Sequence, residues 1–197
     1  MSGRGQRLLR DGENAAVIDV GSNSVRLVVY RIDGRAMTPI LNEKVMAGLG
    51  RDLARTGKLA AAGIDAATHA LRRFAILLEA SGVDTVFAVA TAAVREANDG
   101  RAFATKIEEE TGIALRILDG ADEARLSALG VSGGAPDAEG VVGDLGGASL
   151  ELIEISAKGA DLIAGHWIKL DVKDGLEKAE LQFNDDWVRR GHPAGRR

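Results

Sequence analysis

The sequence contains no cysteine and no long hydrophobic run. Without thiols the protein can form no disulfide, no thiolate nucleophile and no cysteine-ligated zinc or iron site. No apolar stretch approaches the length that crosses a membrane, and the first residues carry no apolar signal segment. We therefore expect a cytoplasmic protein with no membrane partner.

A dominant charge of one sign is also absent. The formal net charge is −4 over 197 residues, so nothing global attracts nucleic acid or an anionic membrane, and we expect neither as a partner. Hydrophobic residues at 46% and charged residues at 27% are ordinary globular values, which argues against disorder over most of the length. A protein of this balance that handles a polyanion must concentrate its positive charge locally.

Several common functional patterns are missing as well. The three histidines, His69, His166 and His192, have no spacing typical of metal ligands. There is no G-x-x-x-x-G-K-[ST] segment, and Gly48-Leu49-Gly50 lacks the third glycine of a dinucleotide-binding loop. Any phosphate chemistry must therefore depend on motifs of another kind.

The sequence does contain the hydrophobic periodicity of an α/β domain. After a polar lead-in over residues 1–14, apolar runs predict strands, and apolar residues every three or four positions predict helices. The predicted strands cover residues 15–20, 25–32, 38–46, 84–90 and 113–118, and the helices cover residues 64–81 and about 98–111. Pro39 places the third strand at a sheet edge. The order β-β-β-α-β-α-β over residues 15–121 is that of ribonuclease-H-like domains, which have a mixed β-sheet.

A second unit begins in the same way as the first. Residues 122–131 predict a helix, and residues 140–144 and 150–156 predict two strands around a glycine-rich turn. This repeats the order strand, aspartate, turn and strand. We therefore expect residues 122–165 to be the truncated start of a second such domain, followed by an atypical tail over residues 166–197.

The second hairpin needs a partner surface. A lone hairpin over residues 140–155 is marginal in water, because the apolar side chains of one face must be covered. These side chains are Val141, Leu145, Leu150 and Leu152. The tail residues at helical spacing, which predict an amphipathic helix, are Val172, Leu176, Ala179, Phe183 and Trp187. We expect either this helix or a second copy of the chain, in a homodimer, to cover the hairpin.

Two matched motifs carry the chemistry: Asp19-Val20-Gly21-Ser22-Asn23-Ser24 and Asp144-Leu145-Gly146-Gly147-Ala148-Ser149. Each places a carboxylate at a strand end, before a turn that contains glycine and hydroxyl groups. Such a turn can point backbone N–H groups at a phosphate, because glycine allows positive φ and close approach. The aspartates suit Mg²⁺, which prefers oxygen ligands and keeps several waters. One motif alone is usually turn chemistry, whereas two, each inside a hairpin, indicate a phosphate clamp.

Three further segments make a resemblance specific. Residues 91–98 (TAAVREAN) resemble an ATSAVREAxN signature, residues 118–125 (LDGADEAR) resemble L-S-G-x-E-E-A-R, and residues 144–152 resemble D-I-G-G-G-S-x-E-L. These are signatures of the exopolyphosphatase / guanosine pentaphosphate phosphohydrolase (Ppx/GppA) family, which belongs to the actin-like (ASKHA) superfamily. Residues from about 15 to 165, roughly three quarters of the chain, resemble the family in order and spacing.

The resemblance implies an actin-like ATPase fold and a Mg²⁺-dependent hydrolase that releases phosphate from inorganic polyphosphate or from guanosine tetra- and pentaphosphate. It assigns Glu123 as the catalytic base that activates water. The phosphate-binding residues that it implies are Gly21, Ser22, Asn23, Ser24, Arg95, Gly146, Gly147 and Ser149. The metal or metal-water ligands that it implies are Asp19, Asp144 and Glu151.

Departures from the family pattern keep two alternatives open. Ala148 replaces the third glycine of the second turn, Asp122 replaces the first of two paired glutamates, and Leu150 replaces a hydroxyl residue. An actin-like kinase would need a second-domain adenosine pocket and usually an aspartate base. A non-catalytic fragment that binds phosphate or alarmone is the other alternative, because half a cleft leaves a site open to water.

Overall fold

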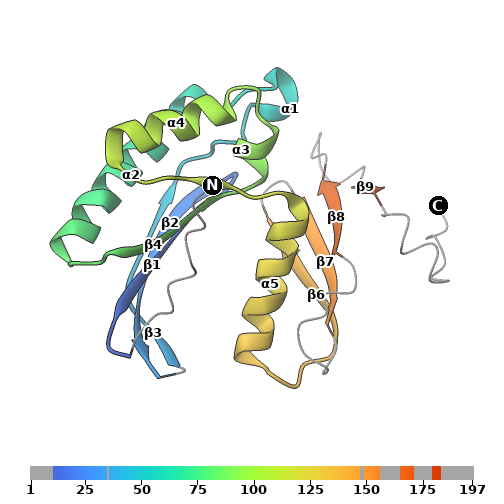
Figure 1. Ribbon diagram of the computed structural model, residues 1–197. Helices are drawn as coiled ribbons and strands as arrows, with labels where there is room; N and C mark the ends of the chain where they lie inside the picture. The colour runs from blue at the N-terminus through green and yellow to red at the C-terminus, as the bar shows by residue number, and fades with distance from the viewer. Residues whose placement is uncertain (1–10, 35, 147–148, 156–164, 171–178, 183–197) are drawn as a thin grey trace, which may run out of the picture.

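The computed structural model describes residues 11–34, 36–146, 149–155, 165–170 and 179–182. The strands form two sheets, sheet A and sheet B (Figure 1). Sheet A consists of β1 (Asn14–Val20), β2 (Ser24–Asp33), β3 (Ala36–Met46), β4 (Thr85–Ala90) and β5 (Arg116–Ile117). Its strand order is β3-β2-β1-β4-β5. Pro39 therefore lies in an edge strand, as the sequence predicts.

The connections of sheet A follow from its strand directions. β1, β2 and β3 are antiparallel neighbours that short turns can join, whereas β4 and β5 run parallel to the strand beside them. Parallel neighbours need a crossover, which helices supply here. The predicted order of strands and helices is confirmed. The fifth strand is shorter than predicted, since only Arg116 and Ile117 pair with β4.

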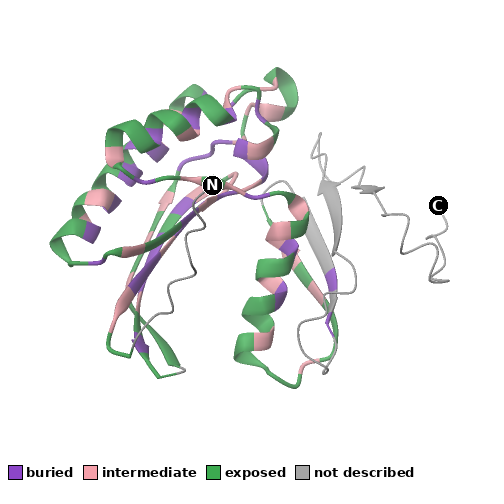
Figure 2. Cartoon of the chain, viewed as in Figure 1, coloured by how far each residue is buried: buried purple, intermediate pink, exposed green. Residues whose placement is uncertain are grey.

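The helices on sheet A cover one of its faces (Figure 1). They are α1 (Leu53–Thr56), α2 (Ala61–Ala80), α3 (Ala92–Glu96) and α4 (Gly100–Thr111), of which the short α1 and α3 are not predicted by periodicity. Ile18 and Leu27 of the sheet and Phe74 of α2 have no exposed surface, and Figure 2 shows the buried residues between helices and sheet. Within the described ranges, no helix is both long and apolar enough to cross a membrane.

The second unit consists of one helix and a four-stranded antiparallel sheet. Helix α5 (Gly120–Gly134) continues past the predicted end at residue 131. Sheet B contains, in this order, β6 (Gly140–Leu145), β7 (Ser149–Ile155), β8 (Gly165–Leu170) and β9 (Ala179–Gln182). Ala124 and Ala128 of α5 pack against Ile153 and Ile155 of β7.

One expectation about this unit is wrong. The hairpin over residues 140–155 does not lack sheet neighbours, because β8 pairs with β7 and β9 pairs with β8. Val141 and Leu145 are 68% and 70% exposed, so cover for them by a second copy of the chain stays a prediction, whereas Val142 lies across from the buried Ile153 on the side that packs on α5.

The predicted tail helix is wrong at Ala179, which lies in strand β9. Val172, Leu176, Phe183 and Trp187, the other four residues that predicted this helix, lie outside the described residues.

Candidate functional site

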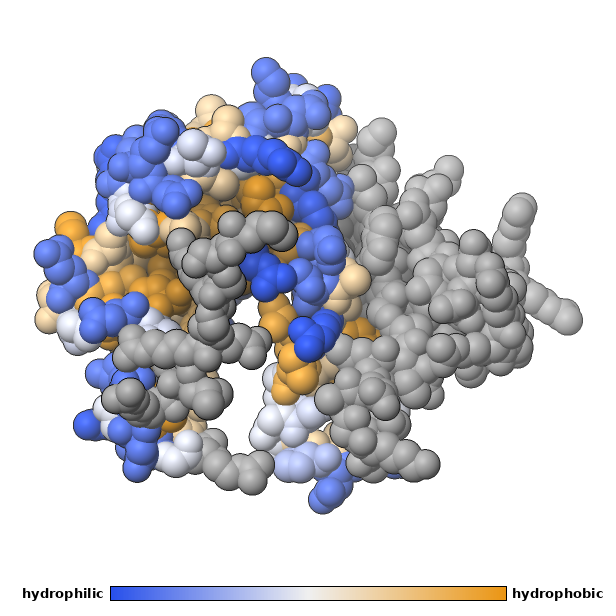
Figure 3. All heavy atoms as spheres, in the orientation of Figure 1, coloured by the Kyte–Doolittle hydropathy of each residue, from blue (hydrophilic) through white to orange (hydrophobic). Residues whose placement is uncertain are grey.

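A cavity of about 1120 Å³ lies between sheet A and the second unit. Its walls come from β1 and the turn after it, from the length of β4, from single residues of β3 and β5, from α5 and from the end of β6. In the space-filling view, an opening separates sheet A from α5, and hydrophobic side chains are visible on both sides of it (Figure 3). The two matched motifs, which begin at Asp19 and at Asp144 and are called the Asp-Gly motifs below, therefore contribute residues to one cavity. Their matched pattern in the sequence predicts that they lie together.

The first motif forms the turn between β1 and β2. Gly21, Ser22, Asn23 and Ser24 all line the cavity, and the backbone N–H of Gly21 donates to the Ser24 carbonyl oxygen at 3.0 Å. No described residue accepts a hydrogen bond from the backbone N–H groups of Ser22 and Asn23. Gly21 does not have the positive φ that the sequence argument assumed. The turn thus offers two backbone donors for an anion without needing a left-handed glycine.

The segment 47–50 holds this turn from behind. The Asn23 carbonyl oxygen accepts from the backbone N–H of Ala47 at 3.0 Å and of Gly48 at 2.9 Å. The Ser22 carbonyl oxygen accepts from Gly50 at 2.8 Å. A Cβ on Gly50 would come within 3.2 Å of the Ser22 Cβ, so glycine permits this close approach. Sequence reasoning missed this supporting role of the segment.

The second motif is described only in part. Asp144, the penultimate residue of β6, and Gly146 line the same cavity. Gly147 and Ala148 lie outside the described residues, and Ser149 is placed only as the first residue of β7. Glu151 is the register partner of Asp144 in the β6–β7 ladder. The structure thus places Asp144 and Gly146 at the same cavity as the first motif.

Asp19 lies in the cavity close to two other carboxylates. Its side chain is open to the solvent of the cavity, yet protein surrounds it on most sides. Burial raises the pKa of Asp19, and the negative charges of Glu123 and Asp144 raise it further, while Arg26 and Lys44 oppose the shift. A cation bound beside these carboxylates would offset the part of the shift that comes from Glu123 and Asp144.

Strand register places cations on both sides of Asp19. Lys44, Arg26, Asp19, Val89 and Arg116 are successive register partners across the five strands of sheet A. Neighbours in register share one face of a sheet, and four strand spacings of ~4.8 Å give the row a length of ~19 Å. Lys44 and Arg116 line the cavity. Only the register joins residues so far apart in sequence, so the sequence alone did not indicate this row.

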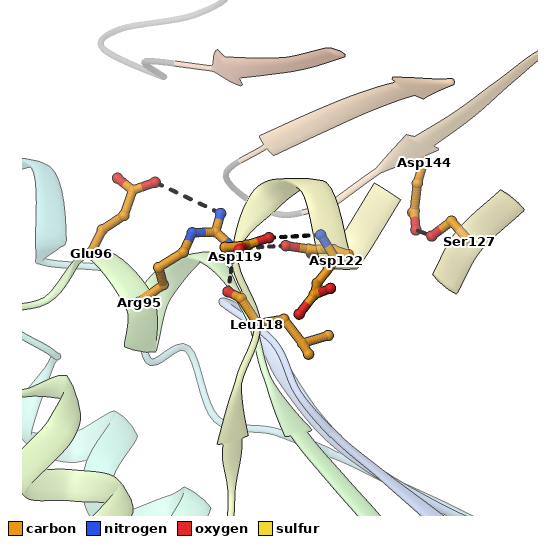
Figure 4. A network of polar contacts seen from close by, with 8 residues as sticks. Arg95, Glu96, Leu118, Asp119, Asp122, Ser127 and Asp144 are labelled. Atoms are coloured by element: carbon orange, nitrogen blue, oxygen red, sulfur yellow. Dashed lines mark hydrogen bonds and ion pairs between the residues drawn. The ribbon is translucent and has the colours of Figure 1, made fainter. Parts of the chain in front are cut away.

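Glu123 lies in the first turn of α5 and lines the cavity. The Asp119 side chain caps this helix by accepting from the Asp122 backbone N–H at 2.7 Å. Arg95 donates from Nη1 to Glu123 Oε2 at 2.8 Å. The same Nη1 donates to the Leu118 carbonyl oxygen at 3.0 Å (Figure 4). The two charged side chains are 21% and 14% exposed. Arg95 is not among the residues that line the cavity. The structure therefore brings Arg95 to Glu123, and contact with a phosphate stays a prediction.

Ser127 is a cavity residue that sequence reasoning missed. It follows Glu123 by four residues on α5, and its hydroxyl donates to Asp144 Oδ2 (Figure 4). The spacing of four, which puts two residues on one side of a helix, was the available signal.

The donor set suits a hard divalent cation. Among the residues that the structure describes, no group of three or more His, Cys, Asp or Glu side chains is arranged to hold a metal ion. Asp19 and Asp144 nevertheless line one cavity, and the charge of Asp144 helps to raise the pKa of Asp19. Mg²⁺ is commonly held by one or two carboxylates together with waters and substrate phosphates. The two aspartates fit this mode of binding.

Comparison with known proteins agrees with this geometry. Exopolyphosphatase 1 of Mycobacterium leprae (strain TN) is 36% identical over 141 residues, which cover 69% of this chain and 41% of that protein. The crystal structure of an exopolyphosphatase from Cytophaga hutchinsonii ATCC 33406 is similar with a TM-score of 0.74 at 28% identity, covering 80% of this chain and 51% of that one. A Ppx/GppA family member from Aquifex aeolicus has a TM-score of 0.68 at 30% identity, covering 74% and 48%.

The chain spans about two fifths of the length of the curated relatives that it matches. The predicted fold class, an α/β fold of the ribonuclease-H-like, actin-like ATPase type, is confirmed. The model of the Ppx/GppA phosphatase family matches residues 28–164, which is more than half of the sequence. The chain belongs to the Ppx/GppA phosphatase family.

Proposed function

We propose that the protein hydrolyses phosphoanhydride bonds and releases phosphate from inorganic polyphosphate, from guanosine pentaphosphate, or from both. The observation that carries this proposal is the single cavity that both Asp-Gly motifs and Glu123 line. The exopolyphosphatase names of the relatives support polyphosphate as a substrate class. The register row across sheet A contains three cations, Lys44, Arg26 and Arg116, and is called the cationic row below. These cations support a substrate with several negative charges along its length.

In this proposal Glu123 accepts the proton of the attacking water. Arg95 engages Oε2 of Glu123, which leaves Oε1 to act as the proton acceptor. A positioned general base of this kind contributes ~10²–10⁴-fold to the rate. Glu123 lines the same cavity as the turns proposed to bind phosphate, which supports its placement as a base near the substrate.

Phosphate groups would be bound by the two turns. The unengaged backbone N–H groups of Ser22 and Asn23 are donors in the first turn, and Ser24 lines the same cavity. Gly146, Gly147 and Ser149 would form the second cradle. Arg95 could contact a phosphate only if its guanidinium turned toward the cavity, because it now binds Glu123 and Leu118.

Mg²⁺ is the cofactor in this proposal, with Asp19, Asp144 and Glu151 as its ligands or the partners of its bound waters. When bound, Mg²⁺ neutralises charge on phosphate oxygens and so favours attack by water. Asp19 and Asp144 meet the requirement for oxygen ligands at one cavity.

We further propose that residues 15–121 form the first unit of the fold and that the second begins at residue 122, within α5; its sheet continues past the predicted end at residue 165 into β8 and β9. A cytoplasmic location and a homodimer belong to the same set of proposals. The exposed side chain of Val141, which does not line the cavity, supports an interaction surface on β6.

Phosphate release from medium-chain polyphosphate and from guanosine pentaphosphate, measured with the full chain and Mg²⁺, tests the function. We expect the native chain to release phosphate. We expect Glu123→Gln to reduce turnover by at least ~10²-fold and to bind tripolyphosphate nearly as well as the native protein, since it keeps size but removes the base.

Other outcomes would separate the alternatives. Binding without release by the native chain would favour a non-catalytic phosphate-binding protein. Transfer of phosphate from ATP to an acceptor would favour an actin-like kinase. Absence of both binding and release would refute the proposal, and equal losses of binding and turnover in Glu123→Gln would refute the role of Glu123 as the base.

A further inference from the structure

Helix α5 brings two polar side chains to the cavity at a fixed separation. Glu123 and Ser127 both line the cavity and lie one helical turn apart. Four residues at 1.5 Å rise give ~6 Å along the helix axis. The helix packs against sheet B through Ala124 and Ala128, each only 1% exposed. The spacing between these two side chains is therefore set by rigid secondary structure.

The Ser127 hydroxyl makes a contact that is unusual for a serine within a helix. Such hydroxyls often bond back to the carbonyl oxygen four residues earlier in the same helix. The Ser127 hydroxyl instead donates across to Asp144 Oδ2 on β6 (Figure 4). Among the described residues no other donor engages the Asp144 carboxylate, which leaves Oδ1 without a partner there.

We infer that Ser127 is a positioning residue for Asp144. The Ser127 hydroxyl fixes one oxygen of the Asp144 carboxylate and so presents the other oxygen to a divalent cation. Because Ser127 and Glu123 lie on the same helix, this also sets the distance between the Asp144 carboxylate and Glu123. The inference rests on the proposed function for its metal, and it deepens that proposal by naming the residue that orients the ligand. Partners that orient a metal ligand typically account for 10–100-fold in metal affinity.

Metal affinity measured on the full chain tests this role without relying on hydrolysis. Isothermal titration with Mg²⁺, in the absence of phosphate, would compare Ser127→Thr with Ser127→Val, which have similar shapes and differ in the hydroxyl. We expect Ser127→Val to bind Mg²⁺ about 10-fold more weakly or worse, and Ser127→Thr to remain near the native affinity. Ser132→Ala, on the same helix but away from the cavity, should leave the affinity unchanged.

The concentration of Mg²⁺ that gives half-maximal phosphate release is a second readout. Ser127→Val should raise it by a similar factor, and turnover at saturating Mg²⁺ should change less than twofold. A merely structural role would lower turnover at every Mg²⁺ concentration and leave the affinity alone.

The results separate this inference from the proposed function. Weaker Mg²⁺ binding by Ser127→Val in a chain that releases no phosphate would support the inference while the proposed function fails. Equal affinities for the Thr and Val variants, or no Mg²⁺ binding by the native chain, would overturn the inference whatever the hydrolysis assay shows. A circular-dichroism melt of each variant confirms that folded protein is being compared.

Discussion

The ion pair between Arg95 and Glu123 should stabilise the fold as well as orient Glu123, the proposed base. The two side chains meet at 2.8 Å while only 21% and 14% exposed, and Arg95 also donates to the Leu118 carbonyl oxygen. Hydrogen bonds to charged groups contribute about 1.5–3 kcal/mol, and removing one member of a buried pair costs about 3–5 kcal/mol. Because both side chains keep some contact with solvent, we expect Arg95→Ala to lower the free energy of unfolding by ~2–3 kcal/mol.

A double-mutant cycle isolates the pair. Urea denaturation of Arg95→Ala, Glu123→Ala and the double variant should give a coupling energy of about 1–3 kcal/mol. The matched control is Arg72–Glu110, which has nearly the same distance, 2.9 Å, but is 51% and 26% exposed. Its coupling should be ~0.2–1 kcal/mol and should fall further in 1 M salt. A coupling for Arg95–Glu123 no larger than that of the control would refute the argument that burial strengthens this pair.

Two further predictions concern stability. The raised pKa of Asp19, caused first by burial, means that the folded state binds a proton more readily than the unfolded chain. Asp19 therefore favours folding at acid pH, and this contribution is lost as the pH rises from the unfolded pKa near 3.8 through the raised pKa of the folded state. In urea titrations at neutral pH with a metal chelator, Asp19→Asn should therefore be more stable than the native protein. Gly100→Ala places a Cβ 1.8 Å from the Val94 carbonyl oxygen and should lower the free energy of unfolding by ~3 kcal/mol. The Cβ of Gly130→Ala meets nothing within 4 Å, so this variant should raise the free energy of unfolding by ~0.5–1 kcal/mol. Thermal melts that gave equal effects for the two variants would contradict this contrast.

The sequence predicted the elements of sheet A well, because their periodicity reflects the side of each element that is buried. The helix over residues 64–81 is α2, in which Ala67, Leu71, Phe74 and Leu78 are buried as their spacing predicts. The strand that ends in Asp19 was equally clear, since apolar residues run up to a glycine-containing turn. Local pattern is sufficient where one element packs against one apolar surface.

Contacts between distant segments were not predictable in the same way. The cationic row depends on the register of five strands, and a shift of one residue would place Lys44 on the other face of the sheet. The support of the first turn by Gly50 depends on a close backbone approach that no periodicity encodes. Ser127 carried a weak signal, its spacing from Glu123, because a serine in a helix has many other roles.

The second unit was harder to predict, and the reason is physical. Val141 and Leu145 are apolar, and the alternation of β6 allowed either side to be the buried one. The structure buries the side of Val142 against α5, whose surface offers the small residues Ala124 and Ala128. In the tail, apolar residues three and four apart suggested a helix, but short apolar patterns do not separate helix from strand reliably, and Ala179 lies in a strand.

Helix α5 links the fold to the candidate chemistry. Successive helical residues are turned by ~100°, so Ala124 and Ala128 follow Glu123 and Ser127 by one position and face a different neighbour. One side of the helix rests on β7 through the two alanines, while the adjacent side presents a carboxylate and a hydroxyl to the cavity. In the first turn of α5, Arg95 of the first unit binds Glu123, and one turn later Ser127 donates to Asp144 of β6. The separation between the proposed base, Glu123, and the proposed metal ligand, Asp144, therefore depends on how closely α5 packs on sheet B, which links the small side chains of that interface to the geometry of the cavity.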